Sequence, residues 1–394
     1  MQAVILAAGK GTRTYPLTAT RPKPLLTAAN KTIIEHNLEQ LDGLVQEAII
    51  VIGYMGEMIK QKLGNYFGKI KLTYVEQTEQ LGSGHALMLA KEHIDERFIV
   101  LNGDDFYSRE DIKNCLKHYY CVLGQKVKDP ENWGIFKLKE GNNVEKLVER
   151  PKEFVSDLAN TGLYVLDNKV FEIDLQKSER GEFEIVDFIT EIAKQYDVYC
   201  ETVKDYWFPV RFAWDLLNIN EFFLNKIKKS IKGDVEKGVY VHGTLVVGEG
   251  TVVKSGTYIE GNVMIGKNCK IGPNCYIRGS TSIGNNCHIG QAVELKNSIV
   301  MDNSNVPHLN YVGDSIIGEK TNLGAGTIVA NLRHDNGNVK TVVKGELIDT
   351  GRRKLGTIIG NNVHTGINTS IYPGRKIWPN KATKPGEVVQ KDIV

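Results

Sequence analysis

A short glycine-rich segment near the start of the chain carries the residue types that phosphate binding requires. Gly9 and Gly11 follow an apolar run, and the cations Arg13 and Lys23 come soon after them. Glycines let backbone N–H groups approach phosphate oxygens closely, and the two cations supply positive charge. A tight turn alone could explain the glycines, but glycines and cations together indicate a phosphate-binding loop.

A second group of polar residues lies in the C-terminal third. Arg278 and Lys296 could bind one anion together, and His308 is followed closely by Tyr311. A neutral histidine can accept a proton near neutral pH, so His308 could act as a general base. The sequence thus contains two candidate sites of different chemistry.

The first half of the chain alternates strands with helices. We expect strands at 3–6, 48–52, 70–75 and 98–101, and helices at 33–41, 56–63 and 84–92. This alternation predicts a mostly parallel sheet with helices on both faces, a Rossmann-like α/β fold. The last of these strands ends at Asn102-Gly103-Asp104, and such sheets bind ligands beyond the carboxyl ends of their strands. Asp104 is therefore a candidate ligand-binding residue.

An aliphatic residue recurs every six positions in the C-terminal third. The series is Val235, Val241, Val247, Val253, Ile259, Ile265, Ile271, Ile277, Ile283, Ile289, Leu295 and Met301. A small or β-branched residue, three times a cysteine, stands four positions later in the hexads that begin at Val247 through Ile289. This period is typical of a left-handed parallel β-helix of hexapeptide repeats, whereas ordinary antiparallel strands would alternate with period two. Three hexads form one coil, so Arg278 and Lys296 should lie on one face of adjacent coils.

The six-residue period is interrupted twice. After Met301 the apolar positions resume at Tyr311 with a shifted register, so we expect residues 302–310, which include His308, to leave the coil. We expect a second loop at 331–355, which contains several basic residues. Loops on a rigid scaffold often carry function, which favours a catalytic role for His308.

The length of 394 residues predicts more than one domain. We expect a nucleotide-binding domain over 1–229, ending in an amphipathic helix at 214–229, and a β-helix over 230–394. The 49 basic and 47 acidic residues nearly balance, so nothing indicates nucleic acid as a partner. The sequence shows no signal peptide, no membrane-spanning run and no paired-cysteine motif, so we expect a cytoplasmic protein with reduced thiols.

The glycine-rich segment and the following Arg21-Pro22-Lys23-Pro24-Leu25 resemble the signature of sugar-1-phosphate nucleotidylyltransferases. Gln77 and the segment 79–86 look like the base-recognition segment of that family. The resemblance implies transfer of a nucleotidyl group from UTP or dTTP to a sugar 1-phosphate, with Mg²⁺ as the cofactor. Its implied residues are Arg13 and Lys23 for catalysis, Gly9, Gly11, Gln77, Gly82 and Ser83 for the nucleotide, Asp104 for the metal ion, and Gly134, Glu149 and Asn160 for the sugar phosphate.

One position departs from the pattern of that family. A second metal-binding Asp or Asn usually follows a tryptophan just before the connecting helix, but here that position is Pro209. A proline side chain cannot bind a metal ion. Three explanations stay open: Asp205 or Asp215 substitutes, the metal ion keeps additional water, or nucleotidyl transfer is weakened. Asp215 could equally be a residue at the N-terminal end of the helix.

The segment Pro307–Asp314 resembles the catalytic segment of the bifunctional enzymes that acetylate glucosamine 1-phosphate and then attach a uridylyl group. This resemblance covers nearly the whole chain and is strongest to archaeal members. It implies that His308 takes a proton from the sugar amine as the amine attacks acetyl-CoA. It further implies that Arg278, Lys296, Tyr311 and Asn331 hold the sugar phosphate, that acetyl-CoA lies near Gly366 and Asn368, and that the protein is a homotrimer.

Three hypotheses follow from these patterns. The first is a bifunctional enzyme of UDP-N-acetylglucosamine synthesis. The second is a single-activity sugar-1-phosphate thymidylyl- or uridylyltransferase with a regulatory β-helix, against which Arg278, Lys296 and His308 argue. The third is a non-catalytic scaffold subunit, which Pro209 favours and the intact Lys23 and Asp104 oppose.

Overall fold

The computed structural model describes residues 1–178 and 181–394 of the chain, which divide into two compact units. The first unit contains Met1–Lys10, Pro22–Leu25 and Ile33–Pro209. The second contains Gly11–Arg21, Leu26–Thr32 and Val210–Val394. This division differs from a single boundary at residue 229, because two N-terminal segments and the helix after Pro209 pack with the β-helix.

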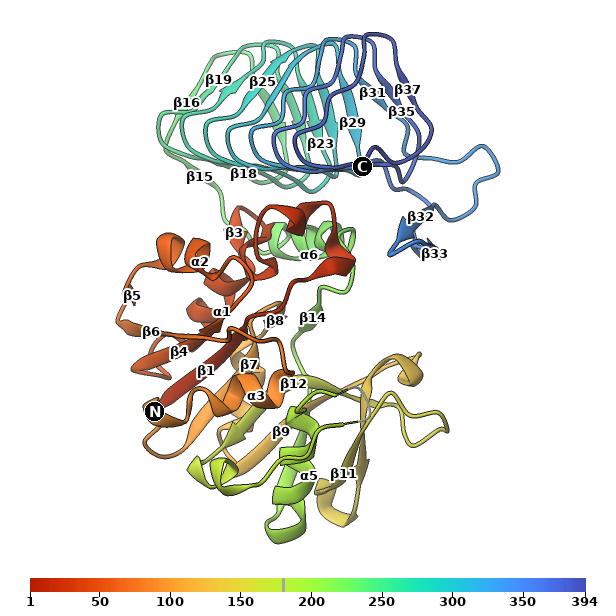
Figure 1. Ribbon diagram of the computed structural model, residues 1–394. Coiled ribbons are helices and arrows are strands. Elements are labelled where there is room, and N and C mark those ends of the chain that lie inside the picture. Colours follow the sequence, from red (N-terminus) through yellow and green to blue (C-terminus); the bar gives the residue numbers. More distant parts are fainter. Residues whose placement is uncertain (179–180) are drawn as a thin grey trace. The chain divides into compact units, whose positions relative to one another are not determined.

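The first unit is built on a ten-stranded mixed sheet (Figure 1). Its main path has the order β11-β10-β12-β7-β1-β4-β6-β5, and β9 and β13 extend it from β12. The strands are β1 (Gln2–Ala7), β4 (Glu47–Ile52), β5 (Tyr66–Phe67), β6 (Ile70–Glu76), β7 (Phe98–Asn102), β9 (Tyr120–Lys126), β10 (Gly134–Leu138), β11 (Val144–Glu149), β12 (Leu158–Leu166) and β13 (Val198–Thr202). The central strands β7, β1, β4 and β6 are parallel, as predicted, while β12 runs antiparallel to β7.

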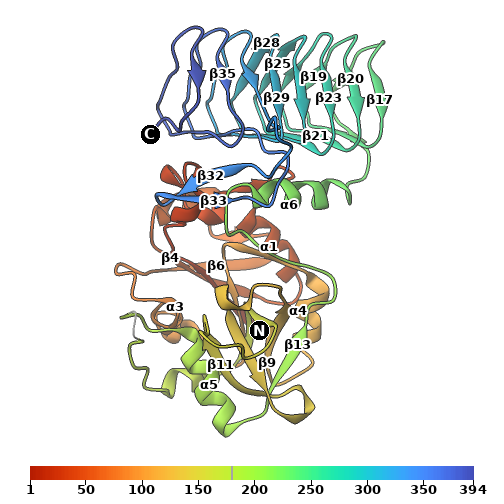
Figure 2. The ribbon, with the colours of Figure 1, turned by 90° about the vertical axis from the view of Figure 1, so that its right-hand side faces the viewer.

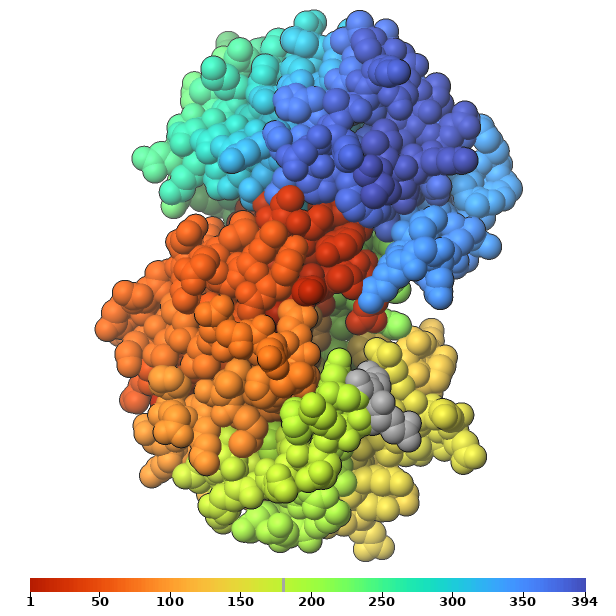
Figure 3. Space-filling model, in the orientation of Figure 1, coloured from red at the N-terminus to blue at the C-terminus, as the bar shows by residue number. Residues whose placement is uncertain are grey.

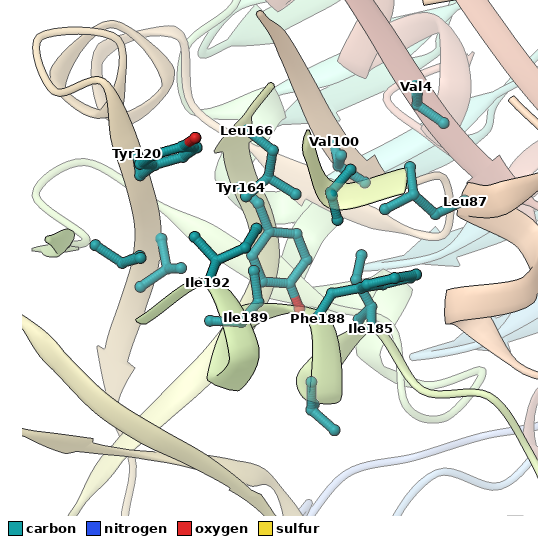
Figure 4. Close-up of a cluster of buried hydrophobic side chains, with 14 of the residues drawn as sticks. Val4, Leu87, Val100, Tyr120, Tyr164, Leu166, Ile185, Phe188, Ile189 and Ile192 are labelled. Carbon is teal, nitrogen blue, oxygen red and sulfur yellow. The ribbon is translucent and has the colours of Figure 1, made fainter. Parts of the chain in front are cut away.

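Both faces of this sheet are covered by helices, because successive residues of its strands point to opposite sides. Val4 belongs to one buried cluster with α3 (Ser83–Met88) and α5 (Ile185–Gln195), which Figure 4 shows. Its neighbours Ala3 and Ile5 belong to the other cluster, with α1 (Ile33–Leu41), α2 (Gly56–Leu63) and α4 (Arg109–Cys115). The helices predicted at 33–41 and 56–63 are confirmed, whereas the helix predicted at 84–92 ends at Met88.

The second unit contains a left-handed parallel β-helix of three stacked sheets, as predicted (Figures 1 and 2). Its first sheet consists of β15 (Ser230–Ile231), β18 (Leu245–Val247), β21 (Val263–Ile265), β24 (Thr281–Ile283), β27 (Ile299–Val300), β30 (Ile316–Ile317), β34 (Ile358–Ile359) and β36 (Lys376–Ile377). The second consists of β16 (Asp234–Val235), β19 (Val252–Val253), β22 (Lys270–Ile271), β25 (His288–Gln291) and β28 (Asn305–His308). The third consists of β17 (Tyr240–His242), β20 (Tyr258–Glu260), β23 (Tyr276–Arg278), β26 (Glu294–Lys296), β29 (Tyr311–Gly313), β31 (Ile328–Val329), β35 (Ser370–Ile371) and β37 (Val388–Val389).

The interior of the β-helix is filled as the hexad pattern predicts. From Val247 to Leu295 the aliphatic positions form one continuous buried cluster, whereas Val241, which the period also predicted to be interior, is 38% exposed. The slot four residues later is buried as well, and its Cys269, Cys275 and Cys287 are free thiols. The Cys287 amide donates to the Cys269 sulfur at 3.4 Å, so these two residues stack on adjacent coils as the period requires.

The prediction of a first loop is wrong, because residues 302–310 stay in the coil. Ile283 pairs with Val300 and Ile289 with Val306, seventeen positions on instead of eighteen, and β28 pairs with β25 along this stretch. The hexad that begins at Leu295 therefore has five residues instead of six. The hexad that begins at Val312, the partner of Leu295, is shortened in the same way. Val312 fills the interior, and Tyr311 lies outside it. Met301 is also outside the core cluster and is instead covered by Arg21, whose Nη1 lies 3.8 Å from its sulfur.

The second predicted loop is confirmed. Ile317 pairs with Ile359, forty-two positions on, so an excursion leaves the coil between Val329 and Ile358. The excursion contains a hairpin of β32 (Lys340–Val343) and β33 (Glu346–Asp349), which Figure 3 shows as a projecting lobe beside the coils. Lys344 and Gly345 both have positive φ at the tip, which is the backbone geometry of a type I′ turn.

Asn220 joins the remaining parts of the second unit to the coils. It lies on α6 (Asp215–Leu224) and is fully buried. Its side chain accepts from the Ala29 amide and the Ser282 hydroxyl, each at 2.8 Å, and donates to the Ser280 carbonyl at 2.9 Å. Helix α6 ends at Leu224, earlier than predicted, so the lysines at 226–229 follow the helix. No helix among the described residues is long and apolar enough to cross a membrane.

Candidate active sites

A cavity of about 250 Å³ lies in the first unit, where the parallel strands end. Five residues expected at the nucleotide site line it: Gly9, Gln77, Gly82, Ser83 and Asp104. Its position fits the rule that α/β sheets bind ligands beyond the carboxyl ends of their strands. The sheet thus brings together residues that are up to 95 positions apart in the sequence.

The walls of this cavity are fixed by backbone contacts. Gly82 has φ of 103°, and a Cβ on it would lie 2.3 Å from the Phe183 carbonyl oxygen, so only glycine fits. The buried Gln77 donates to the Gly82 carbonyl at 3.0 Å, and Gln80 donates to the Ala8 carbonyl at 3.0 Å. These bonds hold the segment that is expected to recognise the base beside the first strand.

Lys23 and Asp104 form an ion pair within the first unit. The Lys23 Nζ lies 2.7 Å from the Asp104 Oδ2, and the lysine side chain is 10% exposed against 39% for the aspartate. The aspartate therefore presents a partly open carboxylate to the cavity, while its partner cation is held in place. The ion pair therefore places the Lys23 ammonium group next to the Asp104 carboxylate, which lines the cavity.

Gly134, Glu149 and Asn160 also come together. Gly134 on β10 is paired with Glu149 on β11. A Cβ at Gly134 would lie 2.9 Å from the Glu149 Oε2 and 3.7 Å from the Asn160 Cβ. Gly162 connects this cluster to the cavity, because a Cβ there would collide with the side chain of the cavity residue Asn102. The residues expected to bind the sugar phosphate therefore lie near those expected to bind the nucleotide.

Pro209 lies beside Asp105, the residue that follows the predicted metal ligand Asp104. Strand β14 (Trp207–Pro209) pairs with β8 (Asp105–Tyr107), and Pro209 is the partner of Asp105. The Asp215 Oδ2 accepts from the Phe212 amide at 2.7 Å, so its carboxylate caps the turn that begins α6. Within the described part of the chain, no group of three or more His, Cys, Asp or Glu side chains forms a ready-made metal site.

Arg13 belongs to the second unit, although it lies only four residues after Gly9. The segment that carries it is held by Thr14 and Thr18, whose hydroxyls donate to the Gly11 carbonyl at 2.6 and 2.7 Å. The Arg13 side chain is exposed and lines a second cavity, of about 520 Å³. The two cations that the sequence suggested for catalysis therefore have different surroundings.

Arg278 and Lys296 are stacked on adjacent coils, as the eighteen-residue coil predicted. Each has an acidic partner: the Arg278 Nη2 lies 2.7 Å from the Glu294 Oε1, and the Lys296 Nζ lies 2.8 Å from the Asp314 Oδ2. The bond to Glu294 raises the pKa of Arg278. The two cations are thus fixed in position side by side.

Asp314 organises this cluster, and sequence reasoning assigned it no role. It is 3% exposed, and it accepts from Lys296, from Asn297 at 2.8 Å and from Asn331 at 2.5 Å. Asn331 also donates to the Tyr311 hydroxyl at 3.2 Å, and burial raises the pKa of Tyr311. No pattern in the sequence singled out Asp314, and the close packing beside it appears only in the structure, where a Cβ at Gly313 would lie 2.6 Å from the Tyr311 hydroxyl.

His308 is exposed at the end of β28, one corner away from Tyr311. The Gly326 amide donates to the His308 carbonyl, and the Asn368 amide donates to the carbonyl of Ala325 on the coil between them. His308, Gly366 and Asn368 therefore lie along the same edge of the stacked coils. His308 reaches this edge as part of a strand, and its exposure comes from the corner that follows.

Comparison with known proteins supports both halves. Residues 2–226 match the family described as nucleotidyl transferase, and residues 259–394 match the GMPPB C-terminal domain. The bifunctional protein GlmU of Methanococcus maripaludis (strain C7) is 46% identical over 100% of this chain and 95% of its own length. A bifunctional sugar-1-phosphate nucleotidylyltransferase/acetyltransferase of Sulfurisphaera tokodaii is 39% identical, with 100% and 98% covered. A UDP-glucose pyrophosphorylase from Acinetobacter baumanii shares the fold alone, with a TM-score of 0.52 and 20% identity over 57% of this chain and 93% of that one.

The mixed sheet with its cavity and the stacked hexapeptide coils define a nucleotidyl transferase combined with a left-handed β-helix. Full-length similarity then decides the narrower group. The chain belongs to the family of bifunctional GlmU proteins.

Proposed function

We propose that the protein makes UDP-N-acetylglucosamine in two steps, acetylating glucosamine 1-phosphate in the β-helix and uridylylating the product in the α/β unit. The observation that carries this proposal is that one chain holds both a cavity at the strand ends with a Lys–Asp pair and a stacked pair of cations on the coils. The second substrate of the first step is acetyl-CoA, and UTP serves the second.

In the acetyl transfer, Arg278 and Lys296 bind the phosphate of the sugar. Arg278 keeps its ion pair with Glu294, and Lys296 keeps its ion pair with Asp314. The sugar amine attacks the thioester carbonyl of acetyl-CoA, so a C–N bond forms and the C–S bond breaks. His308 takes the proton from the amine and returns it to the leaving sulfur. The edge that carries Gly366 and Asn368 holds the coenzyme.

In the nucleotidyl transfer, a phosphate oxygen of the sugar 1-phosphate attacks the α-phosphorus of UTP, and the bond to pyrophosphate breaks. Lys23 neutralises the charge on the phosphates, and Asp104 keeps its ammonium group in place. Gln77, Gly82 and Ser83 bind the base, Arg13 with Gly9 and Gly11 contacts the phosphates, and Gly134, Glu149 and Asn160 bind the sugar.

Asp104 would hold Mg²⁺ in this reaction. The ion usually binds through one or two carboxylates together with substrate phosphates and water, so the partly exposed Asp104 carboxylate suffices where Pro209 replaces a second ligand. Bound there, the ion supplies further neutralisation of the phosphate charge. Asp215, which caps a turn, is not needed as a ligand.

We further propose a homotrimer in the cytoplasm, where UTP and acetyl-CoA are available. The support for a trimer is an apolar edge on the coils: Leu309, Ile328, Ile367 and Val388 are between 44% and 64% exposed. Sedimentation should give three times the monomer mass, and a charged substitution such as Ile367→Glu should dissociate it.

The decisive experiment measures both reactions with the purified full chain. Thiol release from acetyl-CoA should require glucosamine 1-phosphate and be lost in His308→Ala. Pyrophosphate release from UTP should require N-acetylglucosamine 1-phosphate and be lost in Lys23→Ala, with dTTP and glucose 1-phosphate as poorer substrates. Pyrophosphate release without thiol release from any amino sugar phosphate would instead support the single-activity alternative.

A further inference from the structure

The cavity that Arg13 lines is built entirely from the second unit. Three segments far apart in the sequence form it: the segment after Gly11, the tip of the β32–β33 hairpin, and the last two coils. Its volume of about 520 Å³ is in the range of sites for small organic molecules. None of its residues lines the nucleotide cavity described above.

The lining combines apolar walls with an excess of positive charge. Tyr15, Trp378 and three valines supply the apolar surface. The cations are Arg13, Lys344, Arg375, Lys376 and Lys391, against the carboxylate of Asp392. Apolar walls lower the local dielectric constant, so a bound anion is attracted more strongly there than at an open surface.

Two of the cations fix the shape of the cavity. The Lys376 Nζ donates to the Val342 carbonyl at 2.7 Å, and the Arg375 Nη2 donates to the Lys340 carbonyl at 2.8 Å. The Thr341 hydroxyl donates to the Gly374 carbonyl at 2.7 Å. The first strand of the hairpin is therefore fastened to the coils, and the next residue, Lys344, lines the cavity.

We propose that this cavity binds a phosphorylated small molecule with an aromatic or apolar body, such as a nucleoside monophosphate, and that the bound ligand inhibits nucleotidyl transfer by engaging Arg13. The aromatic walls would contact the body of the ligand, while Arg13, Lys344 and Lys391 would contact its phosphate. Arg13 is four residues from Gly9, a wall of the nucleotide cavity. An arginine held by this ligand cannot also neutralise the phosphates of UTP, a consequence that rests on the function proposed above.

The test uses AMP as the probe and the full-length enzyme, first without UTP and then with saturating UTP. Calorimetric titration should show AMP binding, and adenosine and inorganic phosphate should bind at least tenfold more weakly, because each lacks one half of the recognised ligand. The double variant Lys344→Asn/Lys391→Ala should weaken AMP binding at least tenfold. Asparagine is chosen because Lys344 has φ of 51°, which asparagine tolerates.

The matched control is Lys340→Ala, which removes a lysine from the same hairpin outside the cavity and should leave AMP binding unchanged. Equal AMP affinity in the wild type and the double variant would overturn the proposed site. Because AMP and UTP would share Arg13, saturating UTP should weaken AMP binding, and an AMP affinity that UTP leaves unchanged would overturn the link to Arg13. AMP should also slow pyrophosphate release in the wild type and not in the double variant. Binding without inhibition would overturn the link to Arg13, and the calorimetric result can be interpreted even if the enzyme transfers no nucleotide.

Discussion

The two candidate active sites hold their cations in different ways. At the nucleotide cavity, Lys23 is paired with one aspartate, and the surrounding walls are glycines and main chain from strand ends. On the β-helix, Arg278 and Lys296 are set by the coil repeat, and a network of side chains around Asp314 fixes them. The first site depends on where the chain turns, whereas the second depends on which side chains stack.

The largest expected effect separates the two sites functionally. Lys23→Ala should lower the rate of nucleotidyl transfer by about 1,000-fold, because the substitution removes charge stabilisation of the transition state, worth about 4 kcal/mol. Acetyl transfer should change less than twofold. Pyrophosphate and thiol release, assayed on the same preparation, measure both rates, and a parallel loss would show that the sites are not independent.

The next test concerns the network on the β-helix. Asparagine has one side-chain acceptor oxygen and cannot serve Lys296, Asn297 and Asn331 together, as Asp314 does. We expect Asp314→Asn to raise the KM for glucosamine 1-phosphate about tenfold while kcat changes less than threefold.

Asp335→Asn is the matched control for this test, because Asp335 forms an exposed ion pair with Arg333. It should leave both constants unchanged. A normal KM in Asp314→Asn would mean that the cations position themselves without this carboxylate.

A stability measurement tests the register of the coils. Val312 is fully buried in the β-helix core, so Val312→Ala should lower the free energy of unfolding by about 2 kcal/mol. Val342, which is 37% exposed on the hairpin, provides the same substitution at the surface and should cost less than about 0.5 kcal/mol. Denaturant unfolding measures both, and equal costs would contradict the placement of Val312 inside.

The last test concerns Lys376, a buried lysine whose ammonium group donates to the Val342 carbonyl. Lys376 is 2% exposed, and burial lowers its pKa to about 8. Between about pH 8 and 10.5 the unfolded chain binds a proton that the folded chain does not, so stability should rise with pH in that window. Compared with Lys376→Met, the wild type should gain about 1–3 kcal/mol from pH 7.5 to 10.5. Thermal unfolding of both proteins across this pH range measures the gain in stability. An equal change of stability with pH in the two proteins would contradict the lowered pKa of Lys376.

Sequence alone determined the two folds and most of the strand positions. The period of six identified the interior residues from Val247 to Leu295, because each coil repeats the same side-chain environment. The same period placed Arg278 beside Lys296. It failed after Leu295, where one residue is missing from a hexad, since Met301 and Tyr311 continue an apolar series for unrelated reasons. Met301 packs against Arg21, and the Tyr311 hydroxyl accepts from Asn331, so neither side chain fills the interior of the coils.

Only the tertiary structure decided which residues meet. A motif fixes the types of Lys23, Asp104, Gly134 and Asn160, but their proximity depends on the pairing of strands far apart in the sequence. The role of Asp314 and the cavity around Arg13 could not be predicted, because each consists of long-range contacts that no local pattern encodes. Periodicity reports the environment of one side chain at a time, whereas a site is a property of several chain segments brought together by packing.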